Sequence, residues 1–121
     1  MRVTQSWAGN GWGSMFIPRI GMEVVVDFLE GDPDQPIVNG CVYNPDMVPP
    51  YPLPDEKTKS GVKSDSSKGG KGFNEIRFED KKDDEQIFVH AQKDLDMRIK
   101  NDRRELVAND RHTFVQRDKR E

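Results

Sequence analysis

The hydrophobic pattern, with two short runs of apolar residues separated by a polar interval, predicts a β-hairpin early in the chain. The runs at residues 23–29 and 37–43 are rich in β-branched and aromatic side chains, and turn formers fill the interval between them. This pattern is typical of two antiparallel strands. Residues 2–7 are a candidate for a first strand, and a glycine-rich loop follows at residues 8–13. Short strands with glycine and proline punctuation favour a small barrel or sandwich.

A second hairpin follows after residue 73. Residues 74–80 alternate apolar with polar side chains, residues 81–84 form a polar turn, and residues 86–91 form the return strand. We expect the apolar side chains of the two arms to face one another and to give the hairpin one dry face. These side chains are Ile76, Phe78, Ile87, Val89 and Ala91.

The segment between the hairpins has a different composition. Residues 49–54 are rich in proline, which favours an extended polyproline-like conformation. Residues 55–72 are rich in lysine, serine and glycine and are predicted to be a flexible linker. We therefore divide the chain into residues 1–54, a linker at 55–72 and a third region at 73–121.

From residue 94 the sequence repeats every eight residues. The first position of each repeat is aspartate, at Asp94, Asp102, Asp110 and Asp118. The sixth position is always β-branched, at Ile99, Val107 and Val115. Eight is not a helical or coiled-coil period, and β-branched residues prefer extended backbone. The repeat predicts a short strand plus a bend, stacked as a β-solenoid. The asparagines at position eight, Asn101 and Asn109, are expected to take positive φ at the bends.

A single copy of this tail cannot hold itself folded. Ordering eight residues costs about 8–16 kcal/mol of backbone entropy. Burying one or two aliphatic side chains returns roughly 2–6 kcal/mol. Three chains wound about a common axis would remove the deficit by burying each position-six side chain against two identical neighbours. The alternative is a disordered tail, which the polar composition alone suggests, but disorder does not explain the phase of the aliphatic residues.

The sequence also resembles a known family. The runs at residues 13–34, 73–82 and 90–96 are similar to VgrG proteins, the valine–glycine repeat spikes of type VI secretion. The resemblance implies a homotrimer in which an OB-fold barrel is followed by an intertwined, triple-stranded β-helix or β-prism. The repeats lack the glycine of this family, and the sequence is expected to start after the family's N-terminal hub domain. We expect the chain to be a fragment.

The resemblance implies a structural part of a cell-puncturing spike that transmits axial force. Its implied partners are an Hcp tube, a PAAR-type tip protein and an effector. The spike is expected to assemble in the bacterial cytoplasm and to be injected by the contracting machine, with transient contact with a target membrane. We expect export without a signal peptide, and no apolar run of the sequence approaches the length that crosses a membrane.

In the expected trimer, the side chains at the axis come from the second hairpin and from position six of the repeats. They are Ile76, Phe78, Ile87, Val89, Ile99, Val107 and Val115.

Nucleic-acid binding is the first alternative function, because OB folds often stack single strands on aromatic residues. Trp7, Trp12 and Phe16 are available for this role. The whole chain has a net charge of −3, and residues 1–54 carry two basic against six acidic side chains. This surface does not favour a polyanion, so we expect no nucleic-acid partner.

A hydrolase remnant is the second alternative. A lysozyme-like domain needs a pair of carboxylates, but the segment between the two predicted folds is too short for such a domain. Glu75, Glu79 and Asp80 lie among basic residues and are predicted to form salt bridges. His90 and His112 are predicted to be solvated surface residues, and Cys41 is the single cysteine. We therefore expect no catalytic, cofactor or metal site.

Overall fold

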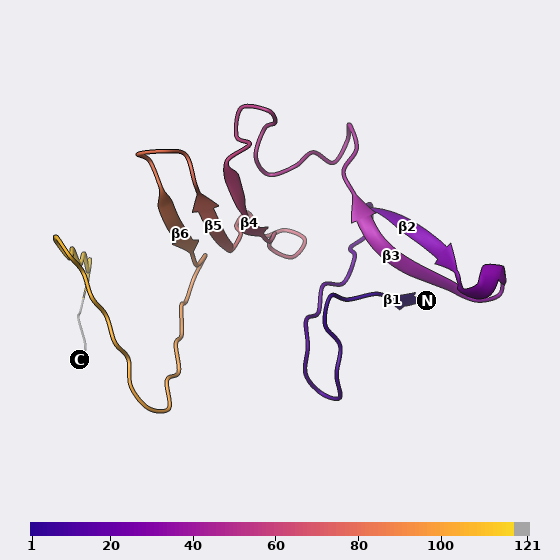
Figure 1. The fold of residues 1–121 in the computed structure, drawn as a ribbon, viewed down its shortest axis with the longest axis horizontal. Coiled ribbons are helices and arrows are strands. Elements are labelled where there is room, and N and C mark those ends of the chain that lie inside the picture. Colours follow the sequence, from indigo (N-terminus) through magenta and orange to yellow (C-terminus); the bar gives the residue numbers. More distant parts are fainter. Residues whose placement is uncertain (118–121) are drawn as a thin grey trace.

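The computed structural model describes residues 1–117, which form two separate three-stranded β-sheets. The first sheet has the strand order β1–β3–β2 and the second has the order β4–β5–β6. The only helical element of the described chain is the 3-10 turn η1 at Leu29–Gly31. Figure 1 shows the sheets at successive positions along the long axis, with the tail leaving the end of β6. The fold class is all-β, as predicted.

The first predicted hairpin is confirmed. β2 (Glu23–Phe28) and β3 (Pro36–Val42) pair antiparallel along their whole length, with a register shift between Val25 and Val26. The turn between them contains Gly31 at φ 72°, a left-handed conformation that glycine adopts without steric cost.

The first strand is shorter than predicted, and the core beside it is very small. β1 (Arg2–Val3) covers only the beginning of the predicted strand at residues 2–7, and it pairs parallel with β3. Val38, in the middle of β3, is 7% exposed and is the only buried hydrophobic residue of the described chain. A folded domain normally buries one contiguous cluster of such side chains. The isolated chain therefore lacks the core that usually stabilises a domain.

The predicted linker contains a strand that the sequence did not reveal. β4 (Lys59–Lys63) lies within residues 55–72 and pairs antiparallel with β5 along its full length. The linker prediction was wrong for these five residues. β4 carries two lysines and one β-branched residue, so its intrinsic strand preference is weak. Its conformation comes from backbone pairing with β5.

The second predicted hairpin is confirmed almost residue for residue. β5 (Glu75–Glu79) and β6 (Gln86–His90) pair antiparallel in the register that sets Ile76 opposite Val89 and Phe78 opposite Ile87. The polar turn between the strands contains Asp83 at a positive φ of 70°.

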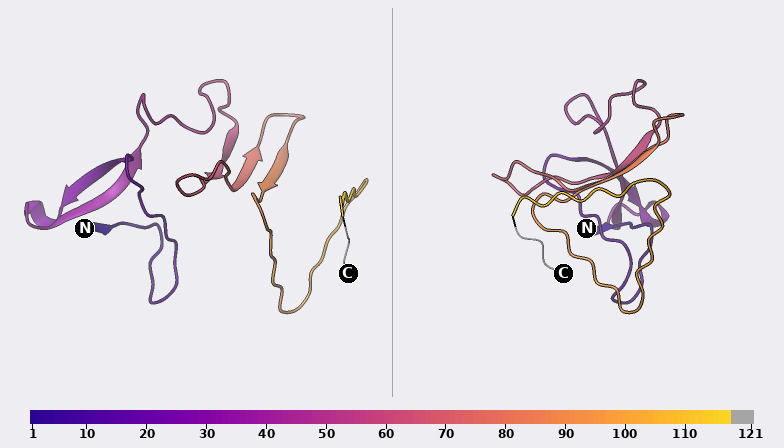
Figure 2. Two further views of the ribbon diagram at one scale, coloured as in Figure 1. Left: turned by 180° about the vertical axis from the view of Figure 1, so that it is seen from behind. Right: turned by 90° about the vertical axis from the view of Figure 1, so that its left-hand side faces the viewer.

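The tail after β6 bends with the period of the sequence. Bends fall at residues 92–93, 100–101, 108–109 and 116–117, which is every eight residues. Seen along the long axis, the tail runs around three sides of an open centre (Figure 2, right). Within residues 1–117 no strand pairs with it. The described tail thus bends with the period expected of a β-solenoid, but its extended stretches form no β-sheet.

The expected positive φ at the bends was wrong. In the described part of the chain, Glu30 and Asp83 are the only residues other than glycine with positive φ, so Asn101 and Asn109 lie elsewhere. A change of chain direction can be made within the extended and right-handed regions, which are open to every L residue. Asp118, the last aspartate of the repeat, lies outside the described residues.

The close approach of β4 to β5 gives a test of the second sheet. A Cβ added to Gly61 would lie 2.3 Å from the carbonyl oxygen of Ile76, whereas one added to Gly40 in β3 would meet nothing within 4 Å. We expect Gly61→Ala to lower the free energy of unfolding by about 1–3 kcal/mol. The matched variant Gly40→Ala should change it by less than about 0.5 kcal/mol. Denaturant titration of both variants measures the difference, and equal losses would contradict the pairing of β4 with β5.

Candidate self-association interface

The second sheet collects apolar side chains from all three of its strands on one face. Val62 lies opposite Ile76, and Ile76 lies opposite Val89, so these three form one row across the sheet. Phe78 and Ile87 belong to the next row on the same side. This apolar sheet face consists of Val62, Ile76, Phe78, Ile87 and Val89. The structure thus brings together the four predicted hairpin residues and adds Val62, which sequence reasoning missed.

The apolar sheet face is open to solvent in the single chain. Exposure of its side chains ranges from 42% at Phe78 to 70% at Ile87. A hollow of about 320 Å³ lies along it, lined by Val62, Ile76, Val89 and Leu95 among others. The predicted apolar face is therefore present, but no other part of the described chain shields it from solvent. Contiguous exposed apolar surface of this kind marks a binding interface.

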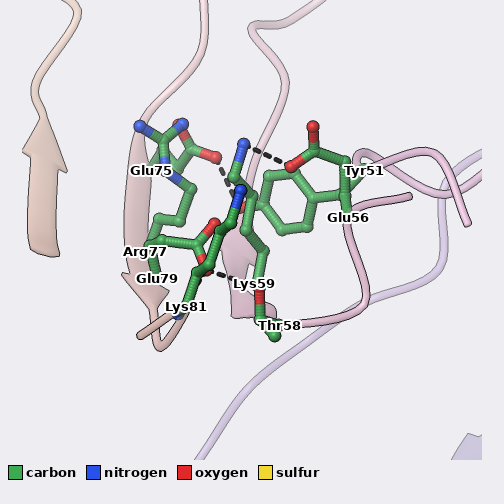
Figure 3. A network of polar contacts seen from close by, with 8 residues as sticks. All are labelled: Tyr51, Glu56, Thr58, Lys59, Glu75, Arg77, Glu79 and Lys81. Atoms are coloured by element: carbon green, nitrogen blue, oxygen red, sulfur yellow. Dashed lines mark hydrogen bonds and ion pairs between the residues drawn. The ribbon is translucent and has the colours of Figure 1, made fainter. Parts of the chain in front are cut away.

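The opposite face of the same sheet carries the charged residues of β5, and another segment of the chain contacts two of them. The cover segment, residues 49–58, carries Tyr51 and Thr58, whose side chains point towards Glu75 and Glu79 of β5 in Figure 3. The Tyr51 hydroxyl donates a hydrogen bond to Glu75, and the Thr58 hydroxyl donates one to Glu79. Glu75 is only 4% exposed. The cover segment therefore satisfies the carboxylates of β5 on this face, whereas the apolar face has no cover from the described chain.

Arg77 balances the buried charge of Glu75. Its Nη1 atom lies 3.3 Å from Oε1 of Glu75, and its guanidinium lies 4.4 Å from the centre of the Phe88 ring. A buried carboxylate is stable only when it is paired and hydrogen-bonded. The salt bridge predicted for Glu75 is confirmed. Glu79 instead accepts hydrogen bonds, from Thr58 and from the backbone amide of Lys81 at 2.8 Å.

This environment changes the acidity of two groups. Burial raises the pKa of Tyr51 to about 12, and the hydrogen bond and negative charge of Glu75 act in the same direction. The hydrogen bond from Thr58 is the main reason that the pKa of Glu79 is lowered, although desolvation opposes it. Both shifts favour the protonation states that hold the cover segment in place at neutral pH.

The histidines pack beside aromatic rings. The His90 ring stacks on Phe73 with 4.4 Å between centres, and His90 is half-buried, so its prediction as a solvated residue was wrong. His112 is exposed, as predicted, with its ring 6.3 Å from Phe114. Within residues 1–117 no cluster of three histidine, cysteine or acidic residues has the arrangement of a metal site. The same residues include no helix long and apolar enough to span a membrane.

The predicted tail residues lie on the less exposed side of the extended backbone. Val107 is 44% exposed, whereas its neighbour Leu106 is 97% exposed. The same contrast separates Val115 from Phe114, and Ile99 is also about half exposed. The eight-residue period therefore places all three position-six side chains in the same kind of environment. Their burial, like that of the apolar sheet face, would require other chains.

The two halves of the sequence match two known families. The family described as "Bacteriophage T4 gp5 C-terminal trimerisation domain" matches residues 60–121. The family described as "Type VI secretion system/phage-baseplate injector OB domain" matches residues 1–43.

Several longer proteins are similar over nearly the whole chain. The type VI secretion system spike protein VgrG4b of Pseudomonas aeruginosa is 57% identical over 116 residues, which are 96% of this chain and 14% of that protein. The spike protein VgrG3 of Vibrio cholerae is 50% identical over 115 residues, 95% of this chain and 11% of its own length. The actin cross-linking toxin VgrG1 of Vibrio cholerae is 48% identical over 121 residues, all of this chain and 11% of the toxin. The chain thus spans only a small part of each relative.

The contact between Tyr51 and Glu75 gives a second prediction. We expect Tyr51→Phe to lower the free energy of unfolding by about 1–3 kcal/mol, because Glu75 remains buried with one donor fewer. Tyr43→Phe is the matched control, since Tyr43 is exposed. Denaturant titration at neutral pH measures both. Equal effects of the two variants would contradict a structural role for the phenol.

The raised pKa of Tyr51 gives a third prediction. A tyrosine ionises near pH 10 in the unfolded chain but near 12 in the folded chain. The stability that the phenol contributes should therefore be complete below pH 10 and be lost as the pH rises towards 12. Tyrosinate absorbance in the Tyr43→Phe variant follows Tyr51 alone. A midpoint near pH 10 under native conditions would contradict the burial of the phenol.

Proposed function

The chain belongs to the VgrG family of type VI secretion system spike proteins, and from this premise we propose that it forms the lower part of a trimeric, cell-puncturing spike. In this proposal, residues 1–54 form the OB-fold base of each copy. The second sheet and the tail of three copies wind together into a β-prism that projects from the base. The role is mechanical rather than catalytic.

One observation carries this proposal: the described chain exposes the apolar residues that a folded protein normally buries. The apolar sheet face is open, and the position-six side chains of the tail are half exposed. These are the residues that a neighbour must cover. They lie within residues 60–121, the region of the trimerisation-domain match.

A threefold arrangement supplies what the tail lacks. Each extended stretch between bends has unpaired backbone groups, because no strand pairs with it within the described chain. Strands from two neighbouring copies would pair with those groups, and unpaired buried backbone groups are costly. In the same arrangement, Ile99, Val107 and Val115 would each meet two copies of themselves at the axis.

Such an interwound prism suits the transmission of force along its axis. No copy can unravel without breaking pairing with the other two, so the load is shared by all three chains. We propose that the spike stands on an Hcp tube, carries a PAAR-type tip protein or an effector, and contacts the target membrane transiently. Assembly in the cytoplasm followed by injection through the machine belongs to the same proposal.

The related toxin of Vibrio cholerae is named for actin cross-linking, an activity of that protein. This chain matches 11% of its length. We propose that the shared part is the spike itself and that such an activity resides in other regions of the longer protein.

Substitution at the proposed axis gives the fourth prediction. Val107→Asp would place three like charges side by side at the axis, so we expect the trimer of the 13.9-kDa chain to dissociate to monomers. Leu106→Asp is the matched control, since this neighbouring side chain is almost fully exposed. It should leave the trimer intact. Native mass spectrometry or sedimentation measures both variants and the unmodified chain.

Two results would contradict the proposal. An unmodified chain that is monomeric at micromolar concentration, with a rigid tail, would remove the need for partners. A trimer that tolerates Val107→Asp as well as Leu106→Asp would show that Val107 does not lie at the axis.

A further inference from the structure

We propose that neighbouring copies also contact each other through a second apolar surface, which lies outside the trimerisation-domain match. This surface, the methionine groove, encloses about 530 Å³ between the segment before β2 and the start of the second sheet. Its principal lining residues are Met15, Phe16, Ile20, Met22, Cys41 and Met47. The inference rests on the proposed trimer and adds to it a contact made by the first region of the chain.

The methionine groove is continuous with the apolar sheet face. Val62 lines the groove, and it also lines the hollow on the sheet face together with Ile76 and Val89. Residues 60–121 match a trimerisation domain. A neighbouring copy seated on the sheet face would therefore lie directly beside the groove, so a second copy of this chain is the occupant that we infer.

The composition of the groove suits a protein contact. Ile20 is fully exposed and Met15 is 79% exposed, although both are large apolar residues. Only two charged residues line the groove, and one of them, Arg19, donates a hydrogen bond from its guanidinium to the carbonyl oxygen of the other, Asp65. Interface centres are depleted of charge and enriched in methionine, whose flexible side chain adapts to an opposing surface.

The size of a typical stable interface also favours a contact between copies at the methionine groove. A stable interface usually involves about 20–30 residues from each partner. In the proposed β-prism these residues come from the second sheet and the tail, so the first region of the chain would contribute none of them without a further contact. The methionine groove adds apolar residues next to the sheet face, on the side that leads back to the first sheet.

Two measurements on the whole chain test the inference. In the first, Ile20→Asp is compared with Leu53→Asp, which changes an exposed aliphatic residue that does not line the groove. Ile20→Asp should raise the concentration at which the trimer is half dissociated by about tenfold or more. Leu53→Asp should leave that concentration unchanged. Ile20 is fully exposed in the single chain, so its substitution should not disturb the fold of one copy.

The second measurement uses Cys41, the only cysteine, which lines the groove and is exposed in the single chain. Its alkylation by N-ethylmaleimide should be at least about tenfold slower in the unmodified trimer than in the Val107→Asp chain, because a neighbour covers the thiol. The rate is followed by mass spectrometry.

The outcomes separate this inference from the proposed function. Slow alkylation of Cys41 in the trimer, with selective weakening by Ile20→Asp, supports the inference. A trimer in which Cys41 reacts as fast as in Val107→Asp, and in which Ile20→Asp behaves like Leu53→Asp, overturns it and leaves the proposed function intact. A monomeric unmodified chain overturns both.

Discussion

The structure depends on one constraint: a single chain cannot cover its own apolar surface. Val38 is the only buried hydrophobic residue of the described chain, while large apolar side chains from both sheets and the tail are exposed. Hydrophobic burial is the main favourable contribution to folding, and in the proposed trimer neighbouring copies would cover this surface. Folding and association are therefore expected to be coupled, and stability depends on chain concentration.

The polar contacts of the second sheet distinguish its two faces. The carboxylate of Glu75 is almost inaccessible to solvent. It accepts a hydrogen bond from Tyr51 of the cover segment and forms an ion pair with Arg77. An ordinary sheet in a single domain buries its apolar face and exposes its polar one. Here the chain covers the carboxylates of β5 on the polar side, and the apolar face is the one that the proposed trimer would bury.

The tail also leaves apolar side chains uncovered, and it does so once in every eight-residue repeat. Its bends recur every eight residues, and Ile99, Val107 and Val115 lie in equivalent environments about half exposed to solvent. In a helix or a hairpin, the backbone groups of one chain satisfy one another. In this tail they have no partner within the described chain, so the extended path makes sense only within an assembly. The proposed mechanical role rests on that mutual dependence, because in the proposed trimer each chain would stabilise the other two.

The sequence by itself determined the elements whose signal is local. β-Branched and aromatic runs predicted the first hairpin. Alternation predicted the second and placed its apolar side chains on one face, because side chains in a strand point to alternate faces. The structure then fixed the register, with Ile76 opposite Val89 and Phe78 opposite Ile87. The period of eight predicted where the tail bends. Only the tertiary structure revealed β4, Val62 as part of the apolar face, and Tyr51 as the partner of Glu75. These features arise from contacts between segments that are far apart in the sequence. A segment with weak strand preference, such as β4, has no local pattern from which its pairing with β5 could be predicted.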